Sequence, residues 1–175
     1  ALDQVHRQGL SVDFVYREKI RQQLETEILQ LVEQINCLLT ESENQPFDLY
    51  KRDKSGQVLK TDQGLPRLQL SYFFSRIDHR LKYNPQLLDY QAPRTDTGRI
   101  RTAEDAWQEY IAYDSALIKY FQVKDRRQAL GSLPIPGPDR PADRVHPKYS
   151  ILSKTGRTSC SKPNIQNVPR QDLVR

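Results

Sequence analysis

The sequence predicts a mainly α-helical protein with a few β-strands, an α+β fold of elongated form. An apolar stripe at steps of three and four residues runs through about residues 14–41, which is the period of a helix. Proline and glycine gather between the periodic stretches. A hydrophobic content of 37% in 175 residues is low for a self-contained globule and suits an extended structure.

The first elements are a strand-like approach at residues 9–12 and a long helix over about residues 14–41. Asp13 is placed to cap this helix. Its buried stripe is predicted to consist of Ile20, Leu24, Ile28, Leu31, Ile35 and Leu38. The opposite face is charged, as expected for a helix with one solvated side.

Residues 43–95 are predicted to be largely irregular. Turn-forming residues favour a loop with a weak hairpin that turns at Gly56. A compact apolar cluster from Leu68 to Ile77 predicts one short helix within this region.

Two returning helices are predicted over about residues 102–131. Thr102 and Asp105 have capping-box spacing and would open the first, which carries Trp107. The second covers about residues 114–131. Its inward side chains are expected to be Leu117, Ile118, Phe121 and Leu130. Its outward side chains are expected to be Lys119, Lys124, Arg126 and Arg127.

Residues 134–143 hold four prolines and are predicted to be a non-helical linker. A strand over residues 144–153 is expected to follow and to run into a segment rich in Arg, Ser, Asn and Gln. That segment reads Thr-Gly-Arg-Thr-Ser-Cys-Ser-Lys-Pro-Asn-Ile-Gln-Asn-Val-Pro over residues 155–169. Its side chains can donate to phosphate oxygens and minor-groove acceptors, although such clusters also occur in plain surface loops.

Charge is divided unevenly along the chain. Residues 1–115 carry 15 Lys and Arg against 18 Asp and Glu, a net −3, whereas residues 116–175 carry 12 against 4, a net +8. A basic segment that coincides with hydrogen-bonding amides favours a polyanionic partner over a merely solvated basic face.

Several classes of site and location are disfavoured. Cys37 and Cys160 are too few for a disulfide framework and are expected to be free thiols in a reducing compartment. His6, His79 and His146 share no ligand spacing, so we expect no metal site. No apolar run approaches the roughly 18 residues of a membrane span, and the sequence shows no signal-peptide pattern.

The segment 155–169 resembles the Thr-Gly-Arg-x-Ser-Ser-x-x-Pro-Asn-Leu-Gln-Asn-Ile-Pro signature of family A DNA polymerases, the group of bacterial DNA polymerase I. Residues 5–13 resemble that family's entry into its long thumb helix, and residues 97–102 resemble the start of its next thumb helix. The resemblance implies a thumb-like helical region at 1–133, the linker at 134–143, and the start of a palm at 144–175. Residues 48–95 match the family poorly, so no site is assigned there.

The resemblance also implies roles for single residues. Arg157 would reach the minor groove at the primer terminus, where its guanidinium can bond acceptors that all four base pairs share. Cys160 stands where the family has a second Ser. The DNA-binding set implied by the resemblance is Arg157, Ser159, Asn164, Gln166, Asn167 and Arg170, joined by Lys124, Arg126 and Arg127 of the basic helix.

These likenesses predict part of a template-directed DNA polymerase that binds primer–template DNA, as a monomer in the cytoplasm of a bacterium or a phage-infected cell. The family's palm carboxylates, which hold Mg²⁺, and its nucleotide-gripping fingers come after the signature. We therefore expect no catalytic or metal-binding residue in this segment, no activity from it alone, and Mg²⁺ and deoxynucleotides to be needed only by the full-length enzyme. Two alternatives are a non-catalytic nucleic-acid-binding module derived from a polymerase and a purely structural helical domain.

Overall fold

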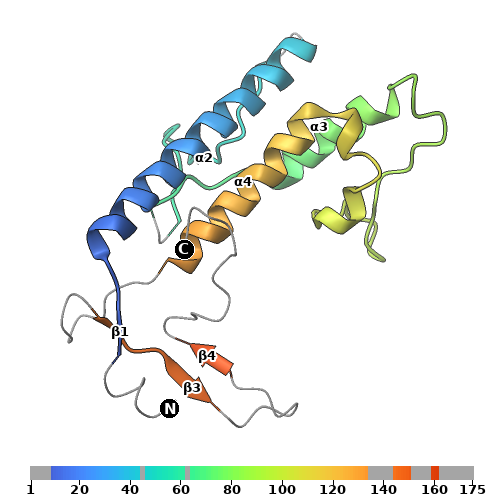
Figure 1. The fold of residues 1–175 in the computed structure, drawn as a ribbon. Helices are drawn as coiled ribbons and strands as arrows, with labels where there is room; N and C mark the ends of the chain where they lie inside the picture. The colour runs from blue at the N-terminus through green and yellow to red at the C-terminus, as the bar shows by residue number, and fades with distance from the viewer. Residues whose placement is uncertain (1–8, 44–45, 62–63, 134–143, 151–158, 162–175) are drawn as a thin grey trace. The chain divides into compact units, whose positions relative to one another are not determined.

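The computed structural model describes residues 9–43, 46–61, 64–133, 144–150 and 159–161. Its three helices are α2 (Phe14–Glu43), α3 (Leu70–Lys82) and α4 (Ser115–Ser132). Four short strands accompany them: β1 (Leu10–Ser11), β2 (Arg144–Val145), β3 (Lys148–Ser150) and β4 (Ser159–Ser161). Figure 1 shows these elements. The predicted fold class, mainly α with a few strands, is confirmed.

The chain divides into two compact units. The first consists of Ala1–Glu27 with Asp125–Arg175, and the second is Ile28–Lys124, so α2 and α4 contribute to both. The division predicted from the sequence, with a linker at 134–143, falls partly outside the described residues and stays a prediction.

The first unit contains two antiparallel strand pairs and the start of α2. Strand β1 pairs with β2, with Leu10 opposite Val145, and β3 pairs with β4, with Tyr149 opposite Cys160. Asp13 caps α2 as predicted, because its Oδ1 accepts the Tyr16 N–H at 2.8 Å.

The long helix expected over about 14–41 is α2, but the centre of its apolar stripe differs from the prediction. The buried positions are Ile20, Leu24, Ile28, Val32, Ile35 and Leu39. Leu31 and Leu38 are only half-buried. The helical period accounts for the shift, since Val32 and Leu39 lie four residues beyond Ile28 and Ile35 and stay on the same face.

The core of the second unit is aromatic. Phe73 and Phe74 of α3 lie 4.9 and 5.1 Å from the Tyr120 ring of α4, measured between ring centroids, and Phe74 lies 5.2 Å from Trp107. Phe73, Phe74 and Trp107 are fully buried. Offset and edge contacts of this kind add to the stabilisation from apolar burial, so α3 and α4 pack tightly within this unit (Figure 1).

Within the second unit, α2 and α4 run antiparallel, as expected of two helices that each have an apolar face. Lys119 of α4 donates to Gln34 of α2 at 2.6 Å. One turn later on α2, the Leu38 carbonyl accepts from Arg80, which also donates to Asp114 just before α4. The pairing order is therefore reversed along the two helices.

The prediction of an α-helix that begins at Thr102 is wrong. The segment forms two 3₁₀ turns, Glu104–Trp107 and Ile111–Tyr113, and Ala103 occupies the N-cap position without a side-chain bond. The Trp107 indole N–H donates to the Arg101 carbonyl at 2.6 Å while its ring enters the aromatic core. That tertiary anchor draws the chain into the tighter 3₁₀ winding and overrides the capping-box pattern.

The predicted inward face of α4 is partly wrong. Leu117, Phe121 and Leu130 are buried, but Ile118 is 38% exposed. Tyr120 and Val123 take its place in the core. Ile118 lies one residue, or about 100° of helix rotation, beyond Leu117, which turns it away from the packed face.

The single strand predicted over 144–153 is divided in the structure. Strands β2 and β3 are separated by His146 and Pro147, because proline cannot donate to a strand ladder. Residues 151–153 lie outside the described residues. The hairpin predicted at Gly56 is confirmed by the Arg52–Val58 bridge and a positive φ of 85° at Gly56.

Candidate nucleic-acid interface

Strand β4 is the described part of the 155–169 segment. It lies antiparallel to β3, with Lys148 opposite Ser161 and Ser150 opposite Ser159. Five predicted DNA-binding residues lie outside the described residues: Arg157, Asn164, Gln166, Asn167 and Arg170. Of the predicted residues from the C-terminal part of the chain, only Ser159 is therefore placed, by its backbone.

Cys160 is the best-defined side chain of this strand. It is buried, with 6% of its surface exposed. The position where the resembled family carries Ser is thus used here for packing. A thiol donates and accepts hydrogen bonds only weakly and behaves as a small apolar group when buried, which suits this environment.

The α4 cations expected to face outward are instead half-buried: Lys124, Arg126 and Arg127. Within the first unit, Arg126 donates to Glu27 at 2.7 Å, and within the second unit Lys124 lies 3.7 Å from Glu104 and 5.5 Å from the Phe121 ring centre. The charges of Lys124 and Arg126 are therefore already balanced by carboxylates on neighbouring segments. Their role in DNA binding stays a prediction.

A second group of cations lies between residues 51 and 67, where the sequence analysis assigned none. We call it the tip cluster: Lys51, Arg52, Lys54, Lys60 and Arg67, all exposed. Arg52 is paired with Asp48 at 2.6 Å. The other four have no carboxylate partner among the residues that the structure describes.

Backbone hydrogen bonds join three segments of the chain beneath the tip cluster. The Lys51 N–H donates to the Arg67 carbonyl at 2.8 Å, the Arg67 N–H to the Leu59 carbonyl at 2.7 Å, and the Leu59 N–H to the Lys51 carbonyl at 2.8 Å. Three segments of chain thus hold one another in a ring. The backbones of Lys51 and Arg67, two exposed cations, are thereby joined directly.

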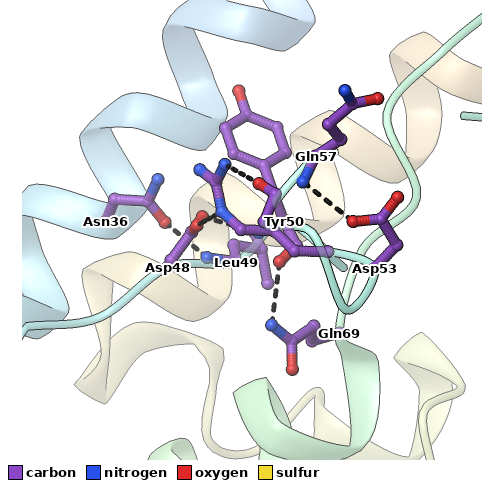
Figure 2. A network of polar contacts seen from close by, with 9 residues as sticks. Asn36, Asp48, Leu49, Tyr50, Asp53, Gln57 and Gln69 are labelled. Atoms are coloured by element: carbon purple, nitrogen blue, oxygen red, sulfur yellow. Dashed lines mark hydrogen bonds and ion pairs between the residues drawn. The ribbon is translucent and has the colours of Figure 1, made fainter. Parts of the chain in front are cut away.

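Side-chain bonds attach this ring to the helices of the second unit (Figure 2). Asn36 of α2 accepts the Leu49 N–H at 2.9 Å, and Gln69, just before α3, donates to the Tyr50 carbonyl at 2.8 Å. The tip cluster therefore has a fixed base, although it consists of turns.

The carboxylates of Asp48 and Asp53, close in sequence to the tip cluster, accept hydrogen bonds from neighbouring residues. Hydrogen bonds from Ser55 and from the Gln57 N–H hold the pKa of Asp53 below its ordinary value. Asp48 accepts from both Arg52 and the Tyr50 N–H. The described acids of this segment are thus used in its turns, and the field of the remaining cations is available to a polyanion.

A groove of about 400 Å³ beside the ring has more acidic than basic lining. It is lined by Glu33, Glu41, Asp48 and Tyr50, and by Arg52 of the tip cluster, which is paired with Asp48. Burial, and then the charges of Glu33 and Asp48, raise the pKa of Tyr50. Phosphate groups are therefore expected at the exposed cations and not in this groove.

The described residues contain no group of three or more His, Cys, Asp or Glu side chains arranged for a metal ion. Among them no helix is both long and apolar enough to cross a membrane.

Comparison with known proteins shows the fold. No protein-family model matches the chain, and no curated protein matches it. A solved structure, the POL domain of Pol1 from M. smegmatis in complex with DNA primer-template and dNTP, matches 99% of this chain with a TM-score of 0.61 and 20% identity. The chain spans 26% of that structure's length. The chain therefore has the fold of part of a DNA polymerase domain.

Proposed function

We propose that this chain is part of a family A DNA polymerase and that it binds primer–template DNA. The observation that carries the proposal is the agreement of fold, over nearly the whole chain, with a polymerase domain bound to DNA primer-template and dNTP. The segment 155–169 supports it, because its Arg, Asn and Gln side chains suit phosphates and minor-groove acceptors.

The proposed interface has two parts. Arg157, Ser159, Asn164, Gln166, Asn167 and Arg170 contact the primer terminus and the template. The tip cluster contacts phosphates through its exposed cations, which supplies affinity without reading sequence.

Catalysis in this proposal needs other parts of the parent protein. Phosphoryl transfer requires carboxylates that hold Mg²⁺, and the described residues contain no such cluster. Carboxylates from other segments of the parent would bind Mg²⁺, and the residues of this chain would position the DNA. We place the parent in the cytoplasm, acting as a monomer.

The test is binding of a fluorescent primer–template duplex followed by anisotropy. If three or so phosphates are neutralised, affinity should fall by an order of magnitude or more between roughly 50 and 200 mM salt. Lys51→Ala and Arg67→Ala should each lower the slope of log affinity against log salt by about 0.9. Arg157→Ala should weaken binding at every salt concentration.

The matched control is Arg21→Ala, because Arg21 is already paired with Glu18 and Glu25 on α2. It should leave affinity and slope unchanged. Binding that is insensitive to salt, or that prefers one DNA sequence, would contradict the proposal. Absence of DNA binding would favour a structural domain.

A further inference from the structure

Gly9 packs closely against the ring of His146. Gly9 is buried and has a φ of +71°. A Cβ atom at this position would lie 2.8 Å from Cε1 and Nε2 of His146 and 3.0 Å from Nδ1. Three ring atoms at nearly equal distance mean that the imidazole presents its face to the Gly9 backbone.

This contact lies beside the paired strands β1 and β2 of the first unit. Gly9 directly precedes β1, and α2 begins a few residues later at its Asp13 cap. His146 directly follows β2, and the buried Pro147 leads into β3, which pairs with β4. One stretch therefore leads into the long helix, and the other leads to the strand that belongs to the 155–169 segment.

The strand pairing beside this contact is short. Strands β1 and β2 share only Leu10↔Val145 and Ser11↔Arg144. Arg144 adds a bond of 3.4 Å to the Gly9 carbonyl. Two-residue strands hold few ladder bonds, so the contact between the His146 ring and Gly9 adds packing that helps to fix one stretch against the other.

We propose that the His146–Gly9 contact is a lock that fixes β3 and β4 against the start of α2, and that His146 is a positioning residue for primer–template binding. The positioning role rests on the proposed function, whereas the lock itself does not. His146 acts through β4, which carries Ser159, and has no DNA contact of its own in this proposal.

The buried thiol of Cys160 can report whether the lock holds β4 in place. It has two cysteines, of which Cys37 is exposed and Cys160 in β4 is buried. In a Cys37→Ser background, the rate at which a thiol reagent labels Cys160 reports how often β4 opens. His146→Ala should raise this rate at least tenfold. His146→Phe keeps a flat ring on Gly9 and should stay within about threefold of the parent.

Gly9→Ala tests the lock from its other side and keeps the test usable if His146→Ala does not fold. A side chain at Gly9 displaces the ring, so Cys160 should again be labelled at least tenfold faster. His79→Ala is the matched control, since it removes an imidazole from α3 in the other unit. It should leave the labelling of Cys160 unchanged.

Primer–template affinity then tests positioning. His146→Ala should weaken binding at least fivefold, while Phe73→Leu, which destabilises the core of the second unit, should not. If labelling of Cys160 does not rise in His146→Ala or Gly9→Ala, the lock is wrong. If labelling rises but affinity holds, the contact is structural only. If the parent chain binds no DNA, the proposed function fails, and the labelling result still decides the lock.

Discussion

Asp114 ties three helices of the second unit together, and its replacement gives a sharp prediction. Its side chain is 2% exposed. Oδ1 accepts the N–H groups of Ala116 and Leu117 at 2.8 and 3.3 Å, which caps α4, and Oδ2 accepts Arg80 Nε at 2.7 Å. Arg80 also donates to the Leu38 carbonyl of α2 at 3.3 Å. One carboxylate thus connects α4 to α3 and, through Arg80, to α2.

The magnitude follows from these bonds. Loss of an N-cap costs about 1 kcal/mol. Removing one partner of a fully buried ion pair costs about 3–5 kcal/mol, but Arg80 is 23% exposed and can regain some hydration. We expect Asp114→Ala to lower the free energy of unfolding by about 3 kcal/mol. Asp114→Asn retains an oxygen for the cap, so it should cost about 2 kcal/mol.

The assay is urea denaturation followed by tryptophan fluorescence, because Trp107 is the sole tryptophan and is buried in the same unit. A double-mutant cycle with Arg80→Ala should give a coupling energy of about 1.5–3 kcal/mol. A cost below about 1 kcal/mol for Asp114→Ala, or a coupling near zero, would show that the carboxylate does not join these helices. An altered denaturant slope would indicate a change in the two-state behaviour.

Three further outcomes are expected. The hydrogen bond from Arg126 holds the pKa of Glu27 below its ordinary 4.5, so the ion pair stabilises the fold above that pH and loses its effect as pH falls through the lowered pKa. Glu27→Gln should therefore cost about 1 kcal/mol at pH 7 and progressively less as the pH falls below 4.5, as measured by urea denaturation followed by circular dichroism. Gly56→Ala should cost about 1 kcal/mol, because φ is +85° while nothing lies within 4 Å of the added methyl group; Trp107 fluorescence would measure it. Phe74→Leu removes edge contacts to Phe73 and Tyr120 and should cost about 1–3 kcal/mol, with a shifted Trp107 emission.

Features set by local periodicity were predictable from the sequence. Helix α2 and its Asp13 cap follow from the spacing of apolar residues and one capping side chain, both of which act within a few residues. The hairpin at Gly56 likewise follows from a glycine that can adopt a positive φ. Fold class followed from the same local signals.

Features set by contacts distant in sequence were not predictable. The Trp107 ring enters a core made by α3 and α4, and that contact decides the 3₁₀ winding around it. The closed ring makes neighbours of Lys51 and Arg67, although no periodicity connects these positions. The run of exposed cations from 51 to 67 was visible in the sequence, but only the folded ring concentrates them.

The cations of this chain differ in whether the fold already pairs them with carboxylates. Arg80 and Arg126 donate to carboxylates at 2.7 Å across helix contacts within their own units, so their charges are balanced inside the fold. Lys51 and Arg67 are exposed, their backbones are joined by a hydrogen bond, and neither has a carboxylate partner among the described residues. A polyanion would neutralise both charges at once. Substitutions at the helix cations should therefore act mainly on unfolding, whereas substitutions in the tip cluster should act on affinity for a polyanion and leave stability nearly unchanged.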